Sequence, residues 1–155
     1  MEKTSNAVIA AAGGDGLARQ GLEIREDPRF APDANEDLRI VGTRRANLLL
    51  EGSADAIRTA LEMLWPEAVE PVLMWSPGQP LQLPPPGRAA TLILHDVSEL
   101  SYVEQHRVLS WLDQIEGRIR VVSTSAVPLW PRVDAGAFND VLYYRLNTVC
   151  VDLGW

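Results

Sequence analysis

The chain has 155 residues, of which 46% are hydrophobic and 23% are charged, proportions typical of one globular domain. Acidic residues outnumber basic residues by 21 to 14, and the Lys and Arg residues form no long cluster, which argues against direct binding to nucleic acid. The sequence has no apolar run of about 18 residues, so no membrane-spanning helix is predicted. A single cysteine, Cys150, is typical of a protein in a reducing compartment such as the cytoplasm.

The first part of the chain shows little periodicity. Residues 1–37 mix glycines, prolines and charges, so we expect a partly mobile N-terminal arm, followed by a single core domain at residues 38–155. The arm contains a glycine cluster, GGDG. It is a poor candidate for a phosphate loop, because no strand clearly precedes it and no Lys-Ser or Lys-Thr pair follows.

A strand and a helix are predicted next. Residues 46–50 indicate a first core strand, and the turn after it leads to a helix that Ser53 or Asp55 can cap and that Pro66 ends. The helix has apolar residues on one face at helical spacing: Ile57, Ala60, Leu61 and Leu64.

Two further strands flank a proline-rich segment. Residues 72–75 predict the second strand, and residues 76–87, SPGQPLQLPPPG, predict an extended loop because their prolines disfavour helix and central strand. This loop is either a rigid connector or a ligand for an aromatic-lined groove on a partner. The third strand, residues 91–94, is followed by His95 and Asp96, which places a carboxylate where open α/β sheets bind ligands.

The next helix has the clearest start signal in the chain. Ser101 and Glu104 form a Ser-x-x-Glu capping box, and Gly117 is the expected end of the helix. Its apolar stripe comprises Val103, Val108, Trp111, Leu112 and Ile115. Residues 119–123 predict the fourth strand.

The C-terminal part predicts a loop, a helix and a strand. Trp130 lies between Pro128 and Pro131, which indicates a loop in which the indole is either an exposed contact point or partly buried against the sheet. Asp134 can cap the helix that follows, and residues 148–153 predict the fifth strand. The residues expected to point inward from this helix are Phe138, Val141 and Leu142.

Three segments between residues 90 and 152 carry a family resemblance: TLILHDVSEL, IRVVSTSA and GAFNDVLYYRLN. They resemble the AAA+ sigma-54 interaction domain of bacterial enhancer-binding transcription activators, whose corresponding motifs are TLFLDEIGEL, VRVIAATN and GxFRxDLYYRLN. The resemblance covers about residues 40–153. It implies a P-loop NTPase-like three-layer α/β/α sandwich around a mostly parallel five-stranded sheet in the order 5-1-4-3-2. The alternation of strands and helices independently favours the α/β class.

In the family, the first strand-turn-helix carries the phosphate-binding loop GESGTGKE, which aligns here with residues 52–59, GSADAIRT. The resemblance therefore implies a degenerate loop in which Gly52 is retained and Arg58 replaces the lysine. Thr59 stands one place after Arg58, where the motif has a magnesium-binding hydroxyl. Asp55 adds a negative charge where the phosphates would lie. A planar guanidinium is also no equivalent of a compact ammonium group.

The other functional positions of the family are also altered. The Asp-Glu pair that supports magnesium and polarises the attacking water is His95 and Asp96 here, and the sensor asparagine is Ala126. Of two arginines that act across subunits in the family, one is Asn139 and the other is retained as Arg145. The resemblance thus leaves Asp96 and Arg145 as candidates for a vestigial catalytic role.

A metal site would need clustered ligands. The available residues are His95, His106 and Cys150, and they show no close paired spacing, so we expect no metal site. Cys150 is expected to be a small buried residue on a strand.

Two hypotheses follow. The GAFTGA loop that contacts sigma-54 and the helical lid have no counterpart in the sequence, so we expect a degenerate, non-hydrolysing domain. Such a domain would act in transcription regulation by binding a protein, either an activator or another copy, with no cofactor. The alternative is a minimal ATP-binding protein or weak ATPase that uses magnesium, Arg58, Thr59, Asp96 and Arg145.

Overall fold

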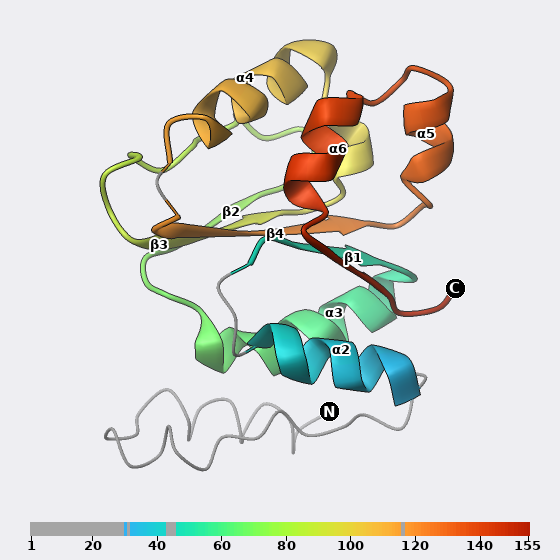
Figure 1. Cartoon of the computed structure of the whole chain (residues 1–155). Coiled ribbons are helices and arrows are strands. Elements are labelled where there is room, and N and C mark those ends of the chain that lie inside the picture. The colour runs from blue at the N-terminus through green and yellow to red at the C-terminus, as the bar shows by residue number, and fades with distance from the viewer. Residues whose placement is uncertain (1–29, 31, 43–45, 116) are drawn as a thin grey trace.

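The computed structural model describes residues 30, 32–42, 46–115 and 117–155, and a five-stranded sheet forms the middle layer of this part (Figure 1). Its strands are β1 (Leu48–Glu51), β2 (Val72–Trp75), β3 (Ala90–Leu94), β4 (Ile119–Ser125) and β5 (Val149–Asp152). All neighbouring strands are parallel, and their order is β2-β3-β4-β1-β5. This is the predicted order 5-1-4-3-2 taken from the other edge, so the predicted topology is confirmed.

Helices cover both faces of the sheet and complete a three-layer sandwich. α2 (Pro32–Gly42) and α3 (Ala54–Leu64) lie on one face, and α4 (Tyr102–Leu112), α5 (Trp130–Asp134) and α6 (Asp140–Leu146) lie on the other (Figure 1). Two single-turn 3₁₀ helices, η2 (Trp65–Glu67) and η3 (Val97–Glu99), follow α3 and β3.

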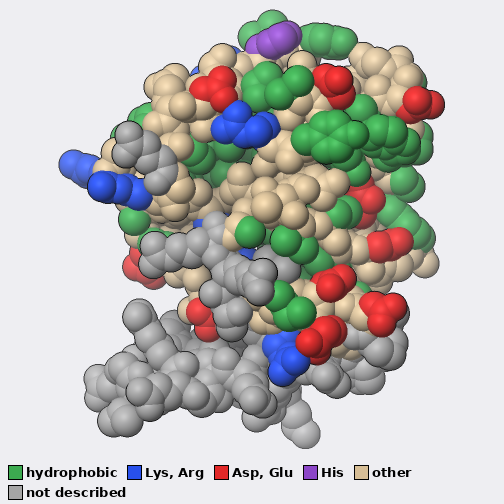
Figure 2. All heavy atoms as spheres, viewed as in Figure 1, with side chains coloured by type: hydrophobic (Ala, Val, Ile, Leu, Met, Phe, Trp, Pro, Cys, Tyr) green, Lys and Arg blue, Asp and Glu red, His purple; other side chains and the backbone are tan. Residues whose placement is uncertain are grey.

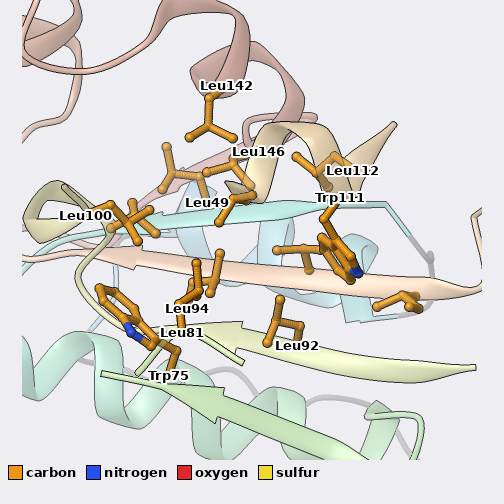
Figure 3. Packing of buried hydrophobic residues seen from close by; sticks show 14 of the residues in the cluster. Leu49, Trp75, Leu81, Leu92, Leu94, Leu100, Trp111, Leu112, Leu142 and Leu146 are labelled. Atoms are coloured by element: carbon orange, nitrogen blue, oxygen red, sulfur yellow. The ribbon is translucent and has the colours of Figure 1, made fainter. Parts of the chain in front are cut away.

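Apart from Arg120 and the Ser-Thr-Ser end of β4, the strands are mainly apolar because both faces of the sheet are covered by helices. In β1, alternate side chains enter different cores: Leu49 packs with Leu142 and Leu146 of α6 (Figure 3). Leu48 and Leu50 instead join the cluster formed with α2 and α3. One short strand therefore holds the two helical layers together.

Side-chain caps start α3 and α4. The Ser53 hydroxyl accepts a hydrogen bond from the Ala56 N–H at 3.3 Å, so Ser53 is the cap of α3. The predicted capping box of Ser101 and Glu104 is confirmed at the start of α4. That helix ends at Leu112, before the glycine predicted to end it; Gly117 has φ +70° in the bend that leads to β4.

The proline-rich segment between β2 and β3 contains no helix or strand, as predicted. Side-chain donors bind its carbonyl groups: the Trp111 indole donates to Pro84 O at 2.8 Å, and the Arg107 guanidinium donates to Leu81 O at 3.1 Å. The Leu81 side chain is buried in the core beside α4. These contacts favour the connector interpretation, because a ligand for a partner's groove would need accessible carbonyls.

The structure corrects the prediction for Trp130. This residue begins α5 instead of lying in a loop, because Pro131 occupies the first helical turn, where proline is tolerated. The Trp130 ring lies 5.6 Å from the Tyr143 ring of α6 and remains 49% exposed. Figure 2 shows apolar side chains grouped over α5 and α6. The cap of α6 is Asn139, whose side chain accepts from Leu142 N–H at 2.9 Å, and not Asp134.

Two predicted core residues are exposed. Val141 is 52% exposed and Val103 is 70% exposed, whereas Phe138 and Leu142 are buried as predicted. The buried face of α4 includes Gln105, whose amide donates to Leu100 O and accepts from the Asn139 N–H. Because its polar groups are satisfied, this glutamine occupies a core position that an apolar stripe would not identify.

The expected arm at residues 1–37 lies mostly outside the described residues. Within that range, Phe30 and Ala34 are buried in the core together with Leu38, and the boundary expected between residues 37 and 38 falls inside α2. In the described part of the chain, no helix has the length and apolar character needed to cross a lipid bilayer.

Candidate functional site

A connection of only two residues, Gly52 and Ser53, separates β1 from α3 at the carboxyl edge of the sheet. The Gly52 N–H donates to Ser125 O at 3.2 Å, and the Ser53 N–H donates to Gly154 O at 3.0 Å. A phosphate loop instead points successive N–H groups at the ligand. Here both of these donors are bound by carbonyl groups of the protein itself.

The C-terminal segment lies tightly against this connection. A Cβ atom at Gly52 would lie 2.8 Å from Gly154 O and 2.9 Å from the Leu153 Cβ. Such distances are closer than non-bonded contacts allow. Gly52 is therefore needed for the close packing of residues 153–154, which occupy the space beside the strand-helix turn.

Thr59 and Arg58 both make contacts within α3. The Thr59 hydroxyl donates to Asp55 O at 3.0 Å, one turn earlier in the helix, and the Thr59 side chain is buried. The Arg58 guanidinium pairs with the Asp55 carboxylate at 2.7 Å on the surface. Asp55, which the alignment placed among the phosphate-loop residues, is thus the partner of both.

A cleft of about 650 Å³ lies between α3 and the carboxyl ends of β2, β3 and β4. We call it the α3 cleft. It is lined mainly by apolar groups, and its residues are Ala54, Ile57, Arg58, Leu61, Glu62, Trp65, Met74, His95, Asp96, Thr124 and Ala126. Of the five predicted site residues, it brings together Arg58 and Asp96.

The remaining predicted residues lie elsewhere. Thr59 lines a smaller depression of about 270 Å³ beside Phe30 and Leu153, on another side of α3. Arg145 belongs to α6, on the opposite face of the sheet, where it donates to the Asp113 carboxylate at 2.5 Å and to Leu112 O at 2.9 Å. It therefore joins α6 to the C-terminal end of α4.

Asp96 has a left-handed backbone conformation, with φ +50°. Its N–H donates to the Thr124 hydroxyl at 3.0 Å, and its carboxylate accepts from the Ser98 hydroxyl at 2.7 Å and from Ala126 N–H at 3.4 Å. Aspartate tolerates this conformation better than most residues. The carboxylate is thus held by the loop after β3 and by the end of β4.

His95 lies beside Asp96 at the polar end of the α3 cleft. Burial lowers the pKa of the imidazole, and the nearby Asp96 carboxylate opposes this effect in part. The ring is therefore neutral at pH 7. A neutral imidazole is a poor ligand for magnesium, which prefers oxygen.

The structure separates the other potential metal ligands. β4 and β1 lie between β3, which leads to His95, and β5, which contains Cys150. Among the described residues, no group of three His, Cys, Asp or Glu side chains is arranged to hold a metal ion. Cys150 is half-buried on β5, and burial raises the pKa of its thiol to about 12.

The apolar walls of the α3 cleft are functional features that were not predicted from the sequence. Ile57 and Leu61 belong to the apolar face predicted for this helix, and Trp65 and Met74 carry no motif that marks them as site residues. A partial signal was present, since Ile57, Leu61 and Trp65 are spaced four residues apart. The contribution of Met74 depends on β2 lying near α3, which local spacing does not reveal.

Comparison with known proteins identifies a family. The family model of the sigma-54 interaction domain matches residues 70–154, and no curated protein matches the chain. Among solved structures, NtrX from Brucella abortus in complex with ATP has a TM-score of 0.66 and 15% identity, over 88% of this chain and 39% of that chain. The complex of the same protein with ADP has a TM-score of 0.64 and 17% identity, over 89% of this chain and 39% of that chain.

The P-loop NTPase domain of the sigma-54 transport activator from E. coli is also similar, with a TM-score of 0.52 and 14% identity, over 70% of this chain and 97% of that chain. Identities this low establish a shared fold, and the chain spans only 39% of the NtrX chains. The sheet order and the flanking helices agree with that P-loop NTPase-like fold. Because the family model matches more than half of its residues, the chain belongs to the sigma-54 interaction domain family.

Proposed function

We propose that this domain acts in transcription regulation by binding another protein and does not hydrolyse nucleotide. The observation that carries the proposal is the closed strand-helix connection, where Ser125 O and Gly154 O accept from Gly52 and Ser53. Without these N–H groups, a triphosphate would lose the backbone donors on which a phosphate loop depends. The role implies that the protein acts in the cytoplasm, without contacting nucleic acid directly.

The altered side chains support the same proposal. Arg58 is paired with Asp55 and Arg145 with Asp113, so each guanidinium already has a carboxylate partner within the protein. Ala126 has only a methyl group where the family's sensor asparagine would reach a phosphate. Its N–H donates to the Asp96 carboxylate, so that N–H is engaged as well.

The second candidate function is weak ATP binding or hydrolysis. The observation in its favour is that Arg58 and Asp96 line one cleft at the carboxyl edge of the sheet, where nucleotides bind in α/β proteins. The NtrX structures in complex with ATP and ADP share the fold, which makes nucleotide binding reasonable to test.

Isothermal titration of the full chain with ATP and magnesium tests the two candidates. We expect no binding heat in the submillimolar range and phosphate release no faster than in buffer. The Arg58→Ala variant shows whether any binding uses the α3 cleft, because it removes the guanidinium group that lines it. Submillimolar binding that is lost in Arg58→Ala, with phosphate release lost in Asp96→Asn, would establish the second candidate and refute the first.

A further inference from the structure

The α3 cleft exposes large apolar side chains in a concave surface. Trp65 is 41% exposed and Met74 is 49% exposed, and they lie with Ile57 and Leu61 around the same space. The cleft volume of about 650 Å³ is within the range of ligand sites. Leaving apolar side chains in contact with water in a concavity is unfavourable, and covering them gains free energy in proportion to the area buried.

The charges of the cleft specify what can cover it. Among the described lining residues, Arg58 is the one Lys or Arg, and it is paired with Asp55, which leaves the acidic residues Glu62 and Asp96. Among the residues that the structure describes, no Lys or Arg forms an ion pair with either of these two carboxylates. His95 adds no positive charge, because its burial favours the neutral ring. An apolar surface bordered by carboxylates that form no ion pair within the described part of the chain is complementary to an apolar group next to a cation.

The cleft is also open to a polypeptide. Met74 belongs to β2, which pairs only with β3 in the described part and forms the edge of the sheet. A chain segment can therefore approach along this edge and insert a side chain between Met74 and α3. Edge strands are common sites for such additions.

We propose that the α3 cleft binds a segment of a partner protein that carries an apolar anchor residue beside a Lys or Arg. The anchor packs between Trp65 and Met74, and the cation lies near Glu62 and Asp96. This inference rests on the proposed function of protein binding, and it names the surface and the chemistry of the partner segment.

Three short fluorescein-labelled peptides test the inference by anisotropy with the full chain: alternating leucine and lysine, alternating serine and lysine, and alternating leucine and glutamate. We expect the leucine-lysine peptide to bind at least about tenfold more tightly than the other two, because only it supplies both the anchor and the cation. The serine-lysine peptide controls for general attraction to an acidic protein of net charge −7.

Variants locate the binding surface. Met74→Asp should lower the affinity for the leucine-lysine peptide by about tenfold or more, since it places a charge in the apolar wall of the cleft. The matched substitution Val103→Asp, at an exposed position of α4 that does not line the cleft, should leave binding unchanged. Glu62→Lys should lower the affinity for the leucine-lysine peptide and raise the affinity for the leucine-glutamate peptide. Circular dichroism and the unfolding midpoint verify that each variant is folded.

Contrary results separate this inference from the function on which it rests. Equal affinity for the serine-lysine and leucine-lysine peptides would show that no apolar anchor contributes to binding. Binding that survives both Met74→Asp and Glu62→Lys would overturn the cleft as the site, although protein binding elsewhere would still stand. Submillimolar ATP binding that depends on Arg58, together with phosphate release that depends on Asp96, would instead refute the proposed function itself.

Discussion

At the carboxyl edge of the sheet, the pKa of Glu51 is changed by the groups around it. It ends β1, and its carboxylate accepts a hydrogen bond from Leu129 N–H at 3.0 Å. Burial raises the pKa of this carboxyl above its ordinary value of 4.5, the Leu129 hydrogen bond opposes the rise, and the neighbouring Asp152 increases it. The charged form of Glu51 is thus less favourable in the folded protein than in the unfolded chain.

We predict that Glu51→Gln raises the unfolding midpoint at neutral pH, and that this advantage shrinks as the pH falls toward 4.5. A raised folded pKa means that the stability contributed by protonated Glu51 is present below the unfolded pKa and is lost as the pH rises through the folded pKa. Glutamine does not titrate, and its amide oxygen can still accept from Leu129 N–H.

Thermal unfolding followed by circular dichroism between about pH 4 and pH 8 measures the Glu51→Gln effect. The variant Glu99→Gln, at an exposed position of η3, controls for the loss of one negative charge from the molecule. A midpoint difference between wild type and Glu51→Gln that stays constant with pH would contradict a raised pKa of Glu51 in the folded protein.

At the scale of elements, each strand was predicted to within two residues at both ends, because buried parallel strands are continuous apolar runs. The site was less predictable. The alignment placed Gly52, Arg58 and Thr59 in one phosphate loop, but the connection has two residues and Thr59 lies on the second turn of α3. A loop conformation depends on what packs against it, here residues 153–154, and a sequence motif contains no such information.

The packing of the β1–α3 connection leads to a second prediction. Gly52→Ala should destabilise the protein by about 1–3 kcal/mol, because the added Cβ would collide with Gly154 O and Leu153. Gly87→Ala is the matched control: its Cβ meets nothing within 4 Å, and we expect a change of about 0.5 kcal/mol or less. Urea unfolding of both variants provides the free energies. Equal stability of the two variants would show that the C-terminal segment does not hold this connection closed.

At the scale of the whole molecule, the structure bears on where the domain begins. The mixture of glycine, proline and charge before residue 38 indicated an arm. Composition predicts local order along the chain, but it does not predict contacts with distant residues. In the structure α2 packs against β5 and α3, and Phe30 and Ala34 lie in the same cluster as Leu48 and Leu50. We propose that the folded domain includes Phe30 and α2.

Substitution of Phe30 tests this boundary. Phe30 is only 6% exposed, so Phe30→Ala should lower the free energy of unfolding by about 3 kcal/mol through lost apolar contact and the cavity left behind. Asp37→Ala, at an exposed position of α2, should change it by about 0.5 kcal/mol or less. Urea unfolding of the full chain measures both variants. If Phe30→Ala were as mild as Asp37→Ala, Phe30 would contribute no core packing and the folded domain would not extend to this residue. A large loss confined to Phe30→Ala would instead place the start of the folding unit at or before this residue, because a side chain in a mobile arm has no cavity to leave.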